Sequence, residues 1–216
     1  PPTKNTRHRD LEYFRLDMRG VSYGGSDLGA DAAASEAAKS GADLVVTSEL
    51  YLCGYPPEDL VQRQSFLAEV KRIVTDLAGE TRDGPAILLG TPWQEGEAVY
   101  NAALLLAGGE VTATRYKSDL PNYGVFDEKR VFDPGELPGP IQFKGVRLGV
   151  MVCEDMWKPD VAQCLAETGA EILVVLNGSP FELDKWEERE KEATRASYAL
   201  SVSSSMSTSV VTVKAE

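Results

Sequence analysis

Short apolar runs alternate along the chain with longer segments whose apolar residues recur at helical spacing. The runs LVV, AILLG and EILVVL have the length and composition of buried strands. Predicted strands cover residues 44–46, 86–90, 146–153 and 171–176, with weaker candidates at 11–18 and 210–213. Predicted helices cover residues 30–40, 58–79, 159–168 and 185–200. This alternation predicts a layered α/β domain.

One pair of strands is predicted to form a hairpin. Residues 99–107 and 110–117 flank Gly108 and Gly109, a spacing typical of a tight glycine turn. Because a hairpin is antiparallel whereas strands joined by helices are parallel, we expect mixed sheet pairing. We find no internal repeat and no linker, so residues 11–216 are interpreted as one domain that follows a flexible leader, residues 1–10.

Composition narrows the classes of function. The 216 residues include 22 basic and 34 acidic side chains, for a net charge of −12. This charge repels phosphate backbones and anionic lipids, so we expect neither nucleic acid nor a membrane surface as a partner. The sequence contains no apolar run of about 18 residues, so no membrane-spanning helix is predicted. Three cysteines make no disulfide framework, which favours a reducing, cytoplasmic location.

Histidine is almost missing from the sequence, which constrains any catalytic mechanism. The single histidine, His8, falls in the polar leader. Ser-His-Asp and Cys-His mechanisms, and most zinc sites, would require it. We therefore expect no metal site, and if the chain is a catalyst, its base is a carboxylate, a lysine or a cofactor.

Three chemically capable side chains stand at the ends of predicted strands. Glu49, Lys117 and Cys153 each follow an apolar or hairpin strand, where layered sheets usually open their pockets. A carboxylate can deprotonate a thiol, and an ammonium can stabilise the thiolate and an oxyanion. Taken singly, each has an ordinary structural interpretation: a buried small thiol, a solvated edge lysine, a turn glutamate. We interpret Cys53 and Cys164 in that structural way.

Three longer motifs resemble a known family. They are TSELYLCGYPPEDL at 47–60, RYKSDLPNYGVFDEKRVFDPG at 115–135 and GVMVCEDMWKPD at 149–160. The chain resembles the nitrilase (carbon–nitrogen hydrolase) superfamily over residues 41–185. Within it, GYPPEDL and LPNYGVFDEKR are most similar to the glutaminase domains of glutamine-dependent NAD synthetases.

This resemblance implies both a fold and a site. The fold is a four-layer α-β-β-α sandwich of the nitrilase type. Since neither end of the chain matches the family pattern, we expect the sandwich to be incomplete at both ends. The implied catalytic residues are Glu49 as general base, Lys117 as electrostatic stabiliser and Cys153 as nucleophile. The residues implied to bind or orient the substrate are Tyr123, Glu128, Glu154, Asn177 and Ser179.

The implied reaction is hydrolysis of the glutamine amide through a cysteine thioester, supplying ammonia for NAD synthesis. No cofactor is expected for this reaction. ATP and Mg would belong to a synthetase domain or subunit, the implied partner, whose SGGxDS-type motif this sequence lacks. The family also implies a homo-oligomer. Two alternatives stay open: a stand-alone amidase for another small amide, and an inactive fragment that serves as an assembly module.

Overall fold

The computed structural model describes residues 42–178 and the backbone of residues 209–214. The leader and the elements predicted at 11–18, 30–40 and 185–200 lie outside these described residues. None of the helices in the described part of the chain has the length and apolar content needed to cross a membrane.

The described strands form two four-stranded sheets. The first has the order β1 (Leu44–Val46), β2 (Ala86–Glu95), β3 (Ala98–Ala107) and β4 (Glu110–Tyr116). The second has the order β5 (Ile141–Phe143), β6 (Val146–Val152), β7 (Ile172–Asn177) and β8 (Ser209–Lys214). Each sheet is mixed, as predicted: β1–β2, β6–β7 and β7–β8 are parallel, and β2–β3, β3–β4 and β5–β6 are antiparallel.

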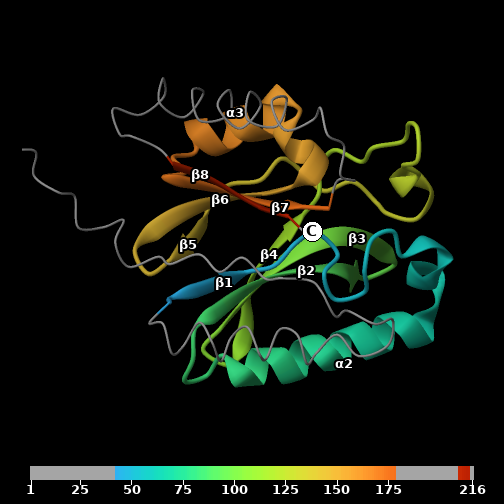
Figure 1. Cartoon of the computed structure of the whole chain (residues 1–216), viewed down its shortest axis with the longest axis horizontal. Helices are drawn as coiled ribbons and strands as arrows, with labels where there is room; N and C mark the ends of the chain where they lie inside the picture. Colours follow the sequence, from blue (N-terminus) through green and yellow to red (C-terminus); the bar gives the residue numbers. More distant parts are fainter. Residues whose placement is uncertain (1–41, 179–208, 215–216) are drawn as a thin grey trace, which may run out of the picture.

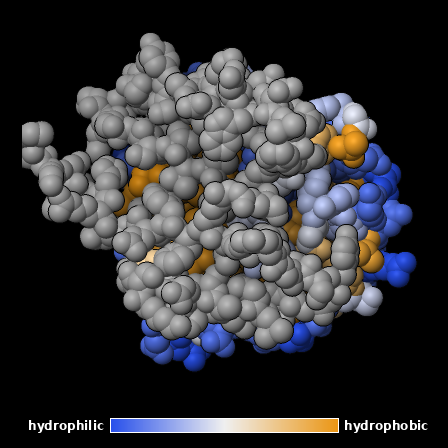
Figure 2. All heavy atoms as spheres, in the orientation of Figure 1, coloured by the Kyte–Doolittle hydropathy of each residue, from blue (hydrophilic) through white to orange (hydrophobic). Residues whose placement is uncertain are grey.

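The two sheets stack face to face between two helices. Helix α2 (Gln64–Glu80) covers the outer face of the first sheet, and α3 (Pro159–Glu167) covers that of the second (Figure 1). The four layers are therefore α-β-β-α, the architecture that the family resemblance implied. The outward side of α2 is mostly hydrophilic in Figure 2 and includes Arg72, which contacts Glu69 and Asp76.

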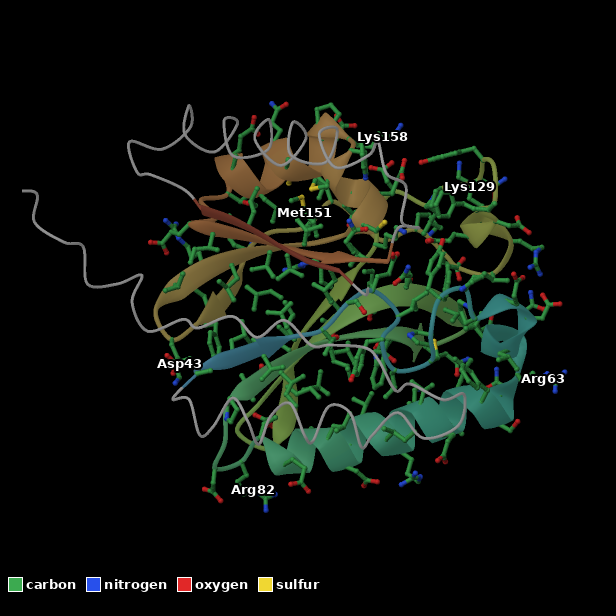
Figure 3. The ribbon with its side chains drawn as sticks, in the orientation of Figure 1. Asp43, Arg63, Arg82, Lys129, Met151 and Lys158 are labelled. Carbon is green, nitrogen blue, oxygen red and sulfur yellow. The ribbon has the colours of Figure 1, made fainter. Side chains whose placement is uncertain are left out.

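Alternation along the strands explains this stacking. In β2, Ile87 packs toward α2, whereas the next residue, Leu88, packs against the other sheet. In the second sheet, Met151 of β6 lies against α3, and Val150 faces the layer between the sheets (Figure 3). Because successive side chains of a strand point to opposite faces, each central strand contributes to two apolar layers.

Local structure departs from the sequence prediction at several points. The single helix predicted over 58–79 is instead a 3-10 turn, η2 (Glu58–Gln62), followed by α2. The break falls at Arg63, which is extended with φ −91° and ψ 118° and is labelled in Figure 3. Strand β2 is five residues longer than predicted, because it pairs with β3 as far as Glu95. Strand β5 was not predicted.

Candidate active site

A buried lysine holds two carboxylates at one end of the sandwich. Lys117, directly after β4, has a fully buried side chain. Its Nζ lies 2.7 Å from Glu49 Oε1 and 2.8 Å from Glu128 Oε1. Glu49 follows β1, and Glu128 begins the short turn η3 (Glu128–Arg130). The structure thus brings together three of the side chains singled out in the sequence, and we call Glu49, Lys117 and Glu128 the charged cluster.

Electrostatics keep Lys117 protonated in this position. Burial alone would lower its pKa, but attraction to Glu49, Cys153 and Glu128 outweighs burial and raises the pKa well above its ordinary value. Burial raises the pKa of Glu128, and Lys117 opposes that rise. The charged cluster therefore carries a permanent ammonium that two acidic groups share.

Backbone and amide donors fix the orientation of the carboxylates. Asn101, a fully buried residue of β3, donates from Nδ2 to Glu49 Oε1 at 2.8 Å and to Glu128 Oε2 at 3.4 Å. The N–H of Gly178 donates to Glu49 Oε2 at 3.0 Å, and the Tyr55 hydroxyl donates to Glu128 Oε1 at 3.0 Å. Both oxygens of each carboxylate are therefore held from different segments of the chain.

Cys153 adjoins the charged cluster from the opposite sheet. It directly follows β6, opens the short turn η4 (Cys153–Met156) and is 5% exposed. Its φ of +45° lies in the left-handed region that residues other than glycine rarely adopt, and such strain is concentrated at functional sites. Cys153 contributes to the raised pKa of Lys117, so the two groups interact electrostatically. The segments that follow β1, β4 and β6 all lie on one side of the sandwich, on the right in Figure 1.

Four of the residues expected to bind substrate, Tyr123, Glu128, Glu154 and Asn177, lie among the described residues. The Tyr123 hydroxyl donates to Glu154 Oε2 at 2.9 Å, next to Cys153 in sequence. Burial and the hydrogen bond to Glu154 raise the pKa of Tyr123 to about 12, so this hydroxyl stays protonated at neutral pH. Asn177 is buried at the end of β7 and directly precedes Gly178, whose N–H contacts Glu49. Ser179 lies outside the described residues.

The other two cysteines have different surroundings. Burial raises the pKa of Cys53 to about 12, and its Sγ donates to the carbonyl oxygens of Leu50 and Gly54. Cys164 lies within α3. Of the three cysteines, only Cys153 directly follows a strand. Across the described ranges, no cluster of three or more histidine, cysteine, aspartate or glutamate side chains is arranged to hold a metal ion.

Three residues that hold the charged cluster, Tyr55, Asn101 and Gly178, were not predicted as functional from the sequence. Asn101 is a polar residue at the start of an apolar strand segment, NAALLL. Its complete burial next to the charged cluster is visible only in the structure. Gly178 leaves room for the carboxylate: an added Cβ would lie 2.7 Å from Glu49 Oε2. A polar residue in an apolar run is a usable signal, whereas a glycine after a strand is an ambiguous one.

The described residues form an α-β-β-α sandwich with a buried lysine between two carboxylates at one end. The family model described as carbon-nitrogen hydrolase matches residues 29–200, most of the chain. The chain belongs to the carbon–nitrogen hydrolase family.

Individual relatives agree with this assignment. The glutamine-dependent NAD(+) synthetase of Rhodobacter capsulatus is 45% identical over 150 residues, 69% of this chain and 27% of that protein. The solved structure of the glutamine-dependent NAD+ synthetase of Acinetobacter baumannii has a TM-score of 0.75 at 32% identity, over 81% of this chain and 33% of that one. The chain thus spans about a third or less of the length of these relatives.

A smaller enzyme also has the same fold. A mutant of the amidase from Nesterenkonia sp. AN1, with the acetamide moiety of fluoroacetamide covalently added at its active site cysteine, has a TM-score of 0.68 at 28% identity. The match covers 84% of this chain and 67% of that amidase.

Proposed function

We propose that this chain hydrolyses the side-chain amide of glutamine through a thioester on Cys153. The observation that carries this proposal is the position of Lys117, whose buried ammonium contacts both Glu49 and Glu128 beside a cysteine in a strained turn. An ammonium fixed in a buried site can stabilise negative charge that develops on a carbonyl oxygen.

The first half of the reaction forms the thioester. Glu49 accepts the proton of the Cys153 thiol, and the thiolate attacks the amide carbon. Lys117 and backbone N–H groups stabilise the tetrahedral oxyanion, an effect worth about 3–4 kcal/mol per donor in comparable sites. The carbon–nitrogen bond then breaks, and the nitrogen takes the proton from Glu49 and leaves as ammonia.

The second half regenerates the enzyme. Glu49 removes a proton from a water molecule, and the resulting hydroxide attacks the thioester carbon. The carbon–sulfur bond breaks, glutamate leaves, and the thiolate recovers its proton from Glu49. Glu128 accepts a hydrogen bond from Lys117, and Asn101 donates one to Glu49. We assign both residues the role of holding these side chains in place during the reaction.

Substrate recognition is assigned to the surroundings of Cys153. Glutamine carries an ammonium group, which suits the carboxylate of Glu154, and Tyr123 fixes that carboxylate by its hydrogen bond. Asn177 and Ser179 complete the proposed pocket on the side of β7. No cofactor takes part in these steps.

The released ammonia is proposed to serve NAD synthesis. The relatives named as glutamine-dependent NAD(+) synthetases support this role, and their much greater length leaves room for a synthetase domain or subunit as the partner. ATP and Mg would act there rather than in the site described above. A homo-oligomer in the cytoplasm is the proposed setting.

A stand-alone amidase is the second candidate function. It is favoured by the fold shared with the Nesterenkonia amidase, a protein of which this chain covers 67% rather than about a third. In that case Cys153 would act in the same way on a smaller amide. The inactive assembly module is the remaining possibility.

Glutamate release from glutamine by the purified chain tests these assignments. We expect release by the unaltered chain and by Cys164→Ala, a matched thiol deletion in α3, but a loss of about 10³-fold or more in Cys153→Ala. Release of acid from acetamide or propionamide, with none from glutamine, would move the proposal to the second candidate. A folded chain that hydrolyses none of these amides would leave only the assembly role.

A further inference from the structure

Another acidic side chain, Asp155, lies behind the site and takes no part in the reaction steps above. It belongs to η4, two residues after Cys153, and is 1% exposed. Its carboxylate accepts three backbone hydrogen bonds: from the N–H of Val152 at 3.0 Å, of Ser118 at 3.0 Å and of Asp119 at 2.9 Å. Burying a carboxylate without hydrogen-bond donors would cost free energy, and here three N–H groups supply those donors.

The three donors flank the reacting side chains. Val152 directly precedes Cys153, and Ser118 and Asp119 directly follow Lys117. Lys117 extends the first sheet beyond β4, whereas Cys153 extends the second sheet beyond β6. Asp155 Oδ1 holds the first segment and Oδ2 holds the second. One rigid carboxylate therefore joins the ends of the two sheets.

This link matters because the layer between the sheets is apolar. Packing of the side chains in that layer is favourable but not directional, so it tolerates small shifts of one sheet over the other. Hydrogen bonds of 2.9 to 3.0 Å are directional and tolerate much less. The chemistry requires the ammonium and the thiol, which come from different sheets, to keep a fixed distance.

We propose that Asp155 is a positioning residue that sets the place of the Cys153 thiol relative to the Lys117 ammonium by joining the two sheets through backbone hydrogen bonds. This inference rests on the proposed function of the site, because it assigns Asp155 a role in the same reaction. It acts only when both carboxylate oxygens accept, which requires the ionised form.

The charge of Asp155 is balanced between opposing influences. Burial raises its pKa, and the N–H donors of Asp119, Val152 and Ser118 together with the Lys117 ammonium lower it, which leaves the pKa at about 6. Arg115 of β4 also faces Asp155 electrostatically, and Glu154 adjoins it in η4. Protonation would place an O–H against one of the N–H donors, so the link should weaken as the pH falls through about 6.

The rate of Cys153 alkylation by iodoacetamide, mapped by mass spectrometry between pH 5 and 8, tests this role without assuming glutamine as substrate. In the unaltered chain we expect the rate to rise through a midpoint near pH 6. In Asp155→Asn, whose amide nitrogen cannot accept from Val152, we expect that midpoint to vanish. At pH 7.5 we expect about a 10- to 100-fold slower rate and a similar fall in kcat for glutamate release, with KM within about threefold.

Asp133→Asn is the matched control, because Asp133 also accepts a backbone N–H, that of Val99, but lies outside the site. It should keep the rate and the pH midpoint of the unaltered chain. If Asp155→Asn fails to fold, Asp155→Glu decides, because the longer side chain keeps the charge but displaces both oxygens: a rate at pH 7.5 about 10-fold slower or more supports the role, and a rate within twofold overturns it. An alkylation rate in folded Asp155→Asn within twofold of the unaltered chain also overturns it. If the proposed function fails, no glutamate is released, but the unaltered chain still alkylates faster than Asp155→Asn. If the role of Asp155 fails, the two chains alkylate at the same rate whether or not glutamate is released.

Discussion

The charged cluster and the apolar layer between the sheets are buried to the same degree but have opposite chemistry. The Lys117 side chain is fully buried, and Leu105 of β3, in the middle of that layer, is 2% exposed. Burying leucine is favourable by about 1.5–3 kcal/mol. Burying an ammonium and a carboxylate costs several kcal/mol per ion, so a buried ion pair adds little net stability even where attraction keeps both groups charged.

This difference in chemistry indicates that the apolar layer serves stability, whereas we assign the charged cluster to the proposed reaction. The apolar layer accounts for the association of the two sheets, because its side chains come from both. We expect the charged cluster to add no comparable stabilisation, and we attribute its three ionisable groups to the proposed reaction of the Cys153 thiol. We therefore expect stability and activity to be separable by substitution.

Lys117→Met should have the largest effect, because it breaks the charged cluster without replacing it. Glu49 and Glu128 would remain buried without their cation, and loss of one partner of a buried pair typically costs about 3–5 kcal/mol. Activity should also fall by at least about 10²-fold, as for loss of an oxyanion donor. Urea unfolding and glutamate release measure the two effects.

The triple variant Glu49→Gln, Lys117→Met, Glu128→Gln is the matched comparison. It removes all three charges at once and keeps similar side-chain volumes, so we expect most of the lost stability to return while the activity stays absent. A triple variant no more stable than Lys117→Met would show that the charges themselves hold the fold, contrary to the comparison drawn above.

Leu105→Ala tests the other region and should have the next largest effect on stability. Truncation of a buried leucine costs about 2–5 kcal/mol, depending on how far the cavity collapses. Because Leu105 lies near the Ala107 end of β3, away from Asn101 and the charged cluster, the activity per folded molecule should stay within about twofold. Leu60→Ala, at a position 40% exposed, is the control and should cost less than about 0.5 kcal/mol. Inactive but fully folded Leu105→Ala would mean that the two regions cannot be separated.

The sequence predicts the apolar layers better than it predicts the site. Runs such as LVV and EILVVL identify strands because burial is recorded in local composition. The ends of those strands also indicate Glu49, Lys117 and Cys153 as candidates. Their grouping around one ammonium does not follow from the pattern, since positions 49, 117 and 128 are joined only by the folded chain.

The parts that were missed depend on contacts between distant segments. Asn101 and Gly178 act through hydrogen bonds to residues 27 to 129 positions away, and Asp155 accepts from N–H groups 36 and 37 positions away, which no local pattern encodes. The broken helix has a similar cause. Val61 of η2 packs in a different apolar cluster from Val70 of α2, so a continuous helical periodicity changes direction at Arg63.

Gly178→Ala should have the smallest effect on stability and so gives the sharpest test of separability. The added Cβ would meet Glu49 Oε2 at 2.7 Å, and because Lys117 and Asn101 hold the other carboxylate oxygen, moving it aside should cost about 1–2 kcal/mol. That movement displaces the proposed base, so we expect kcat for glutamate release to fall by about 10- to 100-fold. In Gly79→Ala of α2, where an added Cβ meets nothing within 4 Å, activity should be unchanged and stability should rise by about 0.5–1 kcal/mol. Full activity in Gly178→Ala would mean that the position of Glu49 does not limit the reaction.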